Sequence, residues 1–434
     1  MNDEISTSNL DNLHRIDIGP GTESGIEDVV IAETYSFFSF FRQIYGFYAI
    51  FAILIFIASL IPEPLLEQSH VRPMWSLARP GGNSIIATQI HGLLPLNHKV
   101  RLSIRFLDVN TTKPPQIGGP IQIIMIKNHK IIADVKSSYL PQIADKIELI
   151  DSKSPYHCVF ESNVVNYDTL YFKAIVHGNY KPEQSVEVKW NVIRIFFASF
   201  EGTFSFTFGI IIFLVILFRF VQQPELHFYF WFTEQKATFW LSITVLSFDF
   251  LAVIPSFFFP SLYSLAIGEI VRSILRSYLI FYSLIIYNLM LREQKRLRTF
   301  RSFLPLIFTV TYFATLTVYL VSNVQEEVEF LWPIETRNVH SPTLYFLLGL
   351  SIIFVIWIIG LIVTTIYVLE YAERTKAFIF SMVSIPFLAI FLLCEIFIHD
   401  LKWINESAVT YSISNGAINT LCLLVEFLHW PISD

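Results

Sequence analysis

Three charged side chains recur at helical spacing inside an otherwise apolar stretch of the chain, SLAIGEIVRSILRSYL. Glu269, Arg272 and Arg276 are three and four residues apart, so a helix presents all three on one face. The preceding apolar stretch contains a lone carboxylate, Asp249. With a rise of about 1.5 Å per residue, Arg272 and Asp249 lie at matching depths, roughly 12 Å and 14 Å from the same end of two antiparallel helices. We therefore expect an Asp249–Arg272 ion pair.

Two interpretations of these four side chains stay open. A charge at the centre of a bilayer costs about 2.5–3.5 kcal/mol, so all four are expected to face protein or water. In the first interpretation the Asp249–Arg272 pair orients two helices, while Glu269 and Arg276 are satisfied along their own helix or by water. In the second, the group lines a cavity that opens to the lumen or to the bilayer and receives a ligand.

The last apolar stretch of the chain carries a second polar group. Asn415 and Asn419 are four residues apart, with Ser412 and Gly416 on adjoining faces. Amides and small residues in membrane helices usually hold neighbouring helices together by hydrogen bonds and close packing. We expect this packing role for Asn415 and Asn419, with contact to a ligand as the alternative.

Signatures of catalysis and of metal binding are missing from the sequence. It has no H-E-x-x-H, no G-x-S-x-G and no glycine-rich phosphate loop, and its histidines form no ligand cluster. Two further carboxylates, Glu201 and Glu395, lie near the ends of apolar stretches and are expected to be solvated. We predict a protein that is not an enzyme, with no catalytic residue, no metal site and no cofactor.

The composition indicates the class of protein that positions these side chains. Hydrophobic residues make up 53% of the chain and charged residues 15%, whereas soluble proteins carry about 25% charged residues. The mean hydropathy is +0.54. A net charge of −6 without a basic bias gives no reason to expect a nucleic-acid partner. The sequence therefore predicts an α-helical membrane protein with several spans, surrounded by membrane lipids.

Eight stretches approach the roughly 20 apolar residues that a membrane-spanning helix needs. The first stands alone, and a long polar segment separates it from a close group of seven. We predict a disordered cytosolic tail over 1–43, a first helix over 44–61, a polar domain over 62–199, a seven-helix bundle over 200–428 and a C-terminal segment over 429–434. The eight stretches are Ile44–Ile61, Phe200–Phe218, Ala237–Phe259, Ser264–Leu291, Phe303–Val321, Thr343–Leu369, Ala377–Ile398 and Ala408–Leu428.

Short apolar runs separated by turn signals fill the segment 62–199. This pattern is typical of a small antiparallel β-sandwich or barrel. The runs that predict strands are Lys99–Val109, Ile121–Lys127, Leu170–Val176 and Ser185–Ile193.

The charges of the short loops predict the orientation. Basic residues crowd the segment 292–301, whereas 326–335 is acidic. Positive loops favour the cytosol, so we expect both termini there and the β-domain in the lumen or outside the cell. Two Asn-x-Ser/Thr glycosylation acceptors, Asn110 and Asn405, fall on that same predicted outer side.

Three motifs carry a resemblance to a known family. They are Glu234-Gln235-Lys236, Thr299–Pro305 (TFRSFLP) and the last helix, Thr410–Pro431, with its Ser-x-x-Asn-Gly-x-x-Asn spacing. The chain resembles the Wntless-like seven-helix proteins, in particular the transmembrane protein 181 family. It departs from that pattern at Ala237, where the family has Trp, and in the third helix around Asp249. The resemblance implies a luminal GOLD-like β-domain on a GPCR-like bundle.

The resemblance also implies a place in the secretory pathway, in the Golgi or endosomes, or at the plasma membrane. The best-understood branch of the family escorts lipid-modified secreted ligands. Our first hypothesis is therefore a trafficking or cargo receptor that binds a secreted or lipid-modified protein on the luminal side and sorting machinery in the cytosol. The alternatives are a GPCR-like cell-surface receptor, including a receptor for a toxin, and an ion channel or transporter.

Overall fold

A computed structural model describes most of the chain between residues 37 and 428. The described ranges are 37–62, 65–73, 83–97, 99–107, 116–117, 121–137, 156–162, 165–177, 185–222, 233–253, 261–292, 298–329, 342–368, 371–400 and 407–428. Residues 1–36 of the predicted disordered tail, both glycosylation acceptors (Asn110 and Asn405) and the C-terminal segment 429–434 lie outside these ranges. Residues 37–43 of that predicted tail are helical instead, because the apolar helix that was expected from residue 44 starts at Phe37.

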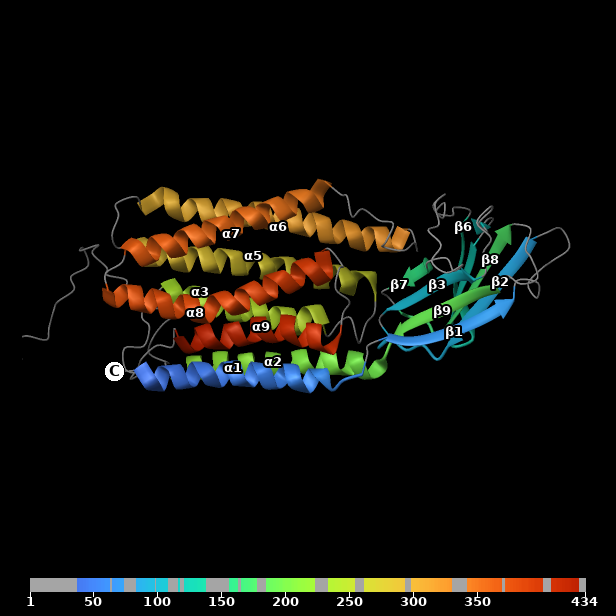
Figure 1. The fold of residues 1–434 in the computed structure, drawn as a ribbon, viewed down its shortest axis with the longest axis horizontal. Coiled ribbons are helices and arrows are strands. Elements are labelled where there is room, and N and C mark those ends of the chain that lie inside the picture. Colours follow the sequence, from blue (N-terminus) through green and yellow to red (C-terminus); the bar gives the residue numbers. More distant parts are fainter. Residues whose placement is uncertain are drawn as a thin grey trace, which may run out of the picture.

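Two antiparallel sheets form a β-domain at one end of the molecule (Figure 1). One sheet has the strand order β1-β9-β3-β7, and the other has the order β2-β8-β5-β6, with β4 also paired to β8. The strands are β1 (Leu65–Pro73), β2 (Asn83–His91), β3 (Val100–Leu107), β4 (Gln116–Ile117), β5 (Ile121–Lys127), β6 (Lys130–Ser137), β7 (His157–Ser162), β8 (Thr169–His177) and β9 (Ser185–Ile193).

The core of the β-domain lies between its two sheets. Leu102 and Trp190 from the first sheet and Phe172 from the second are almost completely buried. The Trp190 indole N–H donates to the Thr88 hydroxyl across the sandwich, at 3.0 Å. Inward side chains that alternate along each strand thus bury an apolar layer, which confirms the predicted antiparallel sandwich.

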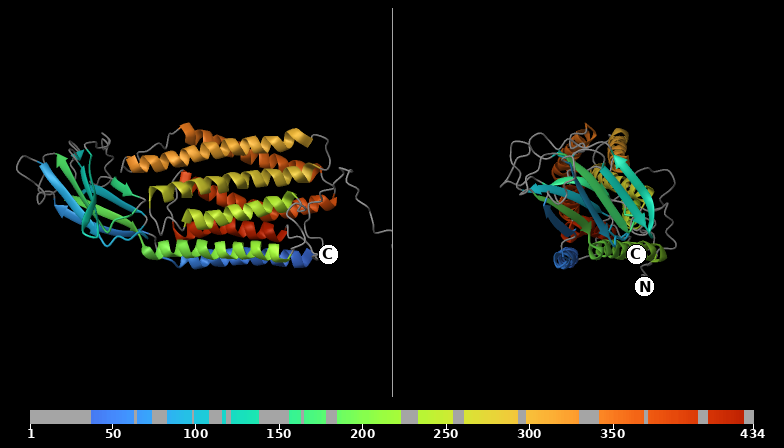
Figure 2. Two further views of the ribbon diagram at one scale, coloured as in Figure 1. Left: turned by 180° about the vertical axis from the view of Figure 1, so that it is seen from behind. Right: turned by 90° about the vertical axis from the view of Figure 1, so that its right-hand side faces the viewer.

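Eight helical segments run side by side next to the β-domain, and two of them end in a π-helical turn (Figures 1 and 2). Helix α5 and helix α9 lie at the centre and are the most buried of the long apolar helices. The segments are α1 (Phe37–Ser59), α2 (Ile195–Gln222), α3 (Thr233–Ser247) with η4 (Phe248–Val253), α5 (Leu262–Arg292), α6 (Arg298–Glu329), α7 (Pro342–Val368), α8 (Tyr371–Cys394) with η6 (Glu395–Asp400), and α9 (Ala408–Leu428).

The helices of the bundle have the length and the apolar composition of membrane-spanning helices. Among the described residues, 6 helices are long and apolar enough to cross one, and a shorter apolar helix covers Ile44–Ser59. Segments α3 and η4 together span about 30 Å at the usual helical rise, close to the thickness of a hydrocarbon core. The chain is therefore an integral membrane protein with several spans, as the composition predicted.

The β-domain is joined to the bundle without a flexible linker. Helix α2 starts two residues after β9 ends at Ile193, and the Asn97 side-chain amide donates to the Ile193 carbonyl at 2.6 Å. Beneath this contact, Ala58 of α1, Phe197 of α2 and Ala408 of α9 form a small buried cluster. Three helices thus meet directly below the strand that enters the bundle.

One glycine allows η4 to lie close to α2. A Cβ atom added at Gly209 would lie 2.7 Å from a ring carbon of Phe250, which is closer than real Cβ contacts. Phe250 also packs edge-on against Phe206, with 5.8 Å between the ring centroids. The absence of a side chain at position 209 therefore fixes the distance between α2 and η4.

Gly209→Ala should lower the thermal stability of the purified protein by about 1–3 kcal/mol, the usual cost of overpacking. The matched control is Gly349→Ala on α7, where no atom lies within 4 Å of the added Cβ. Alanine is a better helix former than glycine, so the control should be neutral or slightly stabilising. Equal melting temperatures of the two variants would contradict this account of the α2–η4 contact.

Candidate functional site: buried polar side chains of the bundle

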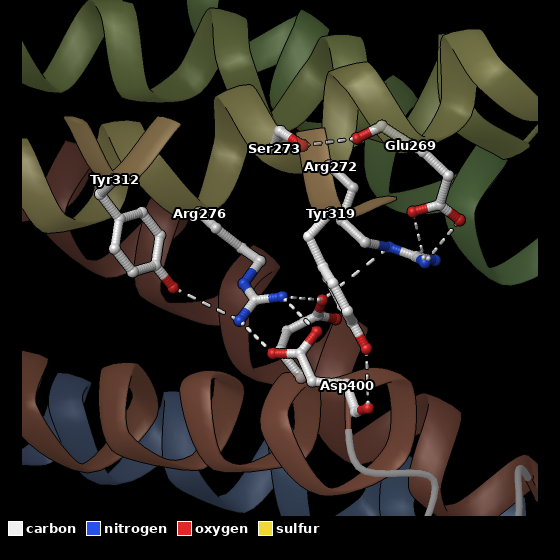
Figure 3. A network of polar contacts seen from close by, with 8 residues as sticks. Glu269, Arg272, Ser273, Arg276, Tyr312, Tyr319 and Asp400 are labelled. Atoms are coloured by element: carbon white, nitrogen blue, oxygen red, sulfur yellow. Dashed lines mark hydrogen bonds and ion pairs between the residues drawn. The ribbon is translucent and has the colours of Figure 1, made fainter. Parts of the chain in front are cut away.

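The most extensive polar network lies around Arg276, a fully buried side chain on α5 (Figure 3). Its guanidinium donates to both carboxylate oxygens of Asp400, at 3.0 Å and 2.8 Å. A further N–H donates to the Tyr312 hydroxyl at 3.4 Å, and Glu395 lies 3.8 Å away. The two parallel bonds to Asp400 form the bidentate geometry that a guanidinium and a carboxylate prefer.

Two structural elements bring the acidic partners to Arg276. Glu395 and Asp400 begin and end η6, the π-helical continuation of α8. π-Helical turns are rare and are frequently found at functional sites. The Tyr319 hydroxyl of α6 donates to the Asp400 backbone carbonyl at 3.2 Å. The network therefore connects α5, α6 and η6 through side chains that are far apart in the sequence.

The same network becomes more exposed toward Glu269. Arg272 forms an ion pair with Glu269 at 3.1 Å and lies 3.8 Å from Glu395. The side chains of Arg272 and Glu269 are 22% and 18% exposed, whereas those of Arg276 and Asp400 are at most 1% exposed. Glu269 is also closer to the start of α5, at the β-domain end of the bundle. The network thus runs from a partly exposed pair at that end to a sealed pair deeper in the bundle.

The expected Asp249–Arg272 ion pair is wrong. Asp249, in η4, instead accepts a bond from the side-chain amide of Asn419 on α9, at 3.4 Å. Depth along two helices does not determine the face on which each side chain lies. Arg272 faces η6 and Asp249 faces α9, so the two charges have different partners. The expected satisfaction of Arg276 by Glu269 or water is wrong as well, because Arg276 binds Asp400.

The two carboxylates that we expected to be solvated are buried. Glu395 is 1% exposed because it faces Arg276 and Arg272 from η6. Glu201 is 7% exposed and lies on the first turns of α2, where the Tyr411 hydroxyl contacts its backbone carbonyl at 3.3 Å. Closeness to a helix end does not ensure contact with water when neighbouring helices cover that end.

A second buried ion pair, which the sequence analysis missed, lies at the end of the bundle away from the β-domain. Arg219 of α2 donates to Glu426 of α9, and both side chains are at most 2% exposed. The Ser242 hydroxyl of α3 donates to the other Glu426 oxygen and lies 3.3 Å from the Cys422 sulfur. A signal was present, because Arg219 and Glu426 are single, opposite charges near the same end of two apolar stretches.

Helix α9 carries a row of polar side chains along one face. Successive members are four, four, three and four residues apart, so they follow one another up the helix. Asn419 also donates to the Asn415 carbonyl at 2.9 Å, and the Tyr411 hydroxyl lies 2.6 Å from that of Ser205 on α2. The row consists of Tyr411, Asn415, Asn419, Cys422 and Glu426. Contacts of Tyr411, Cys422 and Glu426 hold α9 against α2 and α3, and Asn419 contacts Asp249 of η4.

The motif Glu234-Gln235-Lys236 lies in the first turn of α3. Glu234 and Gln235 are 2% and 3% exposed, and only Lys236 is partly accessible. Burial of the first two side chains indicates a packing role. A cytosolic partner could contact this motif only through Lys236.

The described residues contain no group of three His, Cys, Asp or Glu side chains that could hold a metal ion. In the β-domain, a cavity between β1 and β2 has a volume of only about 10 Å³, enough for one water molecule. The polar side chains of the bundle form ion pairs and hydrogen bonds in a buried environment.

Removing the charge of Arg276 should destabilise the protein far more than removing that of Arg272. Arg276→Gln leaves Asp400 buried without its guanidinium, a change that costs about 3–5 kcal/mol. Arg272→Gln breaks a partly exposed pair, for which about 0–1 kcal/mol is typical. Thermal unfolding of the purified variants measures both.

The double variant Arg276→Met/Asp400→Leu tests the reason for this difference. It removes both charges, so it should recover much of the stability that Arg276→Gln loses. A double variant as unstable as Arg276→Gln would contradict the explanation by an unpaired buried charge.

A model of the family described as "Wntless-like, transmembrane domain" matches residues 195–433, more than half of the chain and the whole of the bundle from α2 onward. No curated protein matches the chain.

Proposed function

The chain belongs to the Wntless-like transmembrane family, and from this membership we propose that it is a trafficking receptor that binds a secreted or lipid-modified protein at the β-domain end of its bundle. The Wntless-like family is a non-enzymatic transport and trafficking family, which supports a membrane trafficking or receptor-like role. The narrower assignment to the transmembrane protein 181 branch is part of this proposal.

The observation that carries the proposal is the gradient of exposure in the arginine network. Glu269 and Arg272 are partly exposed at the end of the bundle that adjoins the β-domain, while Arg276 and Asp400 anchor them from a sealed interior. Arg276 binds Asp400 on η6, and Arg272 lies near Glu395 on the same element. A ligand held by the β-domain would therefore meet a fixed pair of opposite charges at the entrance to the bundle.

The proposal includes an orientation. Helix α1 starts and α9 ends at the end of the bundle that lies away from the β-domain (Figure 1). In this proposal the start of α1 and the end of α9 lie on one side of the membrane and the β-domain on the other. The basic segment 292–301 favours the cytosol for the side on which α1 starts. The β-domain then faces the lumen or the cell exterior, where secreted ligands are found.

Capture of ligands from the luminal side tests the function. The double variant Glu269→Gln/Arg272→Gln removes the exposed pair and leaves the Arg276–Asp400 pair intact, so folding and delivery should be preserved. Luminal proximity labelling followed by affinity capture should then recover markedly less secreted protein than with the unmodified chain. The control is Tyr367→Phe, a change of an exposed side chain near the end of α7.

The same experiment separates the other functions. If the double variant and the Tyr367→Phe control recovered the same set of secreted proteins, a ligand site at Glu269 and Arg272 would be contradicted. A stable plasma-membrane pool that responds to an external ligand, with no secreted cargo recovered, would favour a GPCR-like receptor. Currents across reconstituted vesicles would favour a channel or transporter.

A further inference from the structure

Asp249 is a carboxylate inside the bundle with an incomplete set of partners. Its side chain is 0% exposed, and within the described structure its Oδ2 atom has no hydrogen-bond donor. The one bond that reaches it, from Asn419 to Oδ1, is 3.4 Å long, whereas N–H···O bonds are usually about 2.7–3.2 Å. Such a carboxylate is strongly unfavourable in an apolar interior unless something compensates its charge.

Asn419 leaves a second oxygen atom without a donor. Its amide nitrogen contacts the Asn415 carbonyl at 2.9 Å and the Asp249 carboxylate at 3.4 Å. Both of these neighbours are acceptors, so the orientation of the amide is fixed with nitrogen toward them. The Asn419 Oδ1 atom is buried and has no donor among the described residues. Two orphan acceptors therefore lie on two side chains that contact one another.

The two buried guanidinium groups of the described residues are bound to other carboxylates and not to Asp249. Arg219 on α2 is bound to Glu426, which also accepts a bond from Ser242. Ser242 precedes Asp249 by seven residues, or about 10 Å along the helix. The other buried arginine, Arg276, is bound to Asp400.

We propose that Asp249 and Asn419 form a binding site for one small monovalent cation, Na⁺, in the interior of the bundle. The cation would take oxygen ligands from the Asp249 carboxylate and the Asn419 side-chain carbonyl. One carboxylate balances one positive charge, whereas a divalent ion would leave a net charge in the apolar interior. Na⁺ is preferred over K⁺ because the two side chains are already in contact within a close-packed core.

The local helix geometry supports a binding site. Asp249 is the second residue of the π-helical segment η4. Such segments are uncommon and are frequently found at functional sites. A cation can take both orphan oxygens as ligands. A proton on the Asp249 Oδ2 atom would also neutralise the charge and could be donated to the Asn419 Oδ1 atom. The two occupants differ in how stability depends on Na⁺ and on pH.

The purified full-length protein in detergent provides the test. Its melting temperature should rise with NaCl concentration and then saturate, because a ligand that binds only the folded state stabilises it. Equal concentrations of KCl and choline chloride, which give the same ionic strength, should produce a clearly smaller shift. The Na⁺-specific part of the shift should disappear in Asp249→Asn.

Two further variants keep the test decisive if Asp249→Asn does not fold. Asn419→Ala retains the charge but removes one oxygen ligand. Changes that only touch the surroundings of metal ligands weaken binding by about 10–100-fold, so loss of a ligand should move the NaCl midpoint at least that far. Glu426→Gln alters the buried carboxylate of α9, which is outside the proposed site, and should keep the Na⁺-specific shift.

Two results would overturn the proposal. The first is an unmodified protein with the same melting temperature in NaCl, KCl and choline chloride. The second is a melting temperature that depends on pH between about 5 and 9 but not on Na⁺ at any pH, since a proton would then be the occupant. Full Na⁺ dependence in Asp249→Asn would place the cation elsewhere and would equally refute the site.

Discussion

A guanidinium in the interior of a membrane protein must find its counter-charge within the protein, because neither lipid nor water can supply it. Arg276 meets this requirement through Asp400, and the arrangement of three elements depends on that bond. Segment η6 must carry a carboxylate to α5 at the right depth, and α6 must supply Tyr312 and Tyr319 to complete the hydrogen bonds. The π-helical turn that ends α8 is where this requirement is met.

Helix α9 is held by a different kind of interaction. Its polar row contacts α2 and α3, with the Arg219–Glu426 ion pair at one end and the Tyr411–Ser205 contact toward the other. A small residue completes the packing, because a Cβ atom at Gly416 would lie 3.1 Å from the ring of Phe51 on α1. The first helix, which stands apart in the sequence, thus packs against the last one. Hydrogen bonds and close approach replace the hydrophobic effect, which is weak between helices in lipid.

The sequence predicted helices and strands well where their residue pattern is local. It did not predict the contacts between side chains that are far apart in the sequence. Strands β3, β5, β8 and β9 were predicted because their inward residues are apolar and β-branched. Strand β1, LLEQSHVRP, was missed because it is an exposed edge strand without an alternating pattern. Arg276 was singled out as one of three charges on a helix face, but its partner, Asp400, is 124 residues away. Spacing predicts which side chains share a helix face, and only packing determines what that face meets.

The link between the two parts of the molecule follows from the same packing. Strand β9 passes into α2 across a single residue, and Asn97 fixes the Ile193 carbonyl at this point. A displacement of β9 cannot be absorbed by a loop, so it must move the first turns of α2. Those turns carry Ser205, which contacts Tyr411 on α9 at 2.6 Å. The covalent chain from β9 to α2 and the contact between Ser205 and Tyr411 therefore connect the β-domain to the polar row of α9.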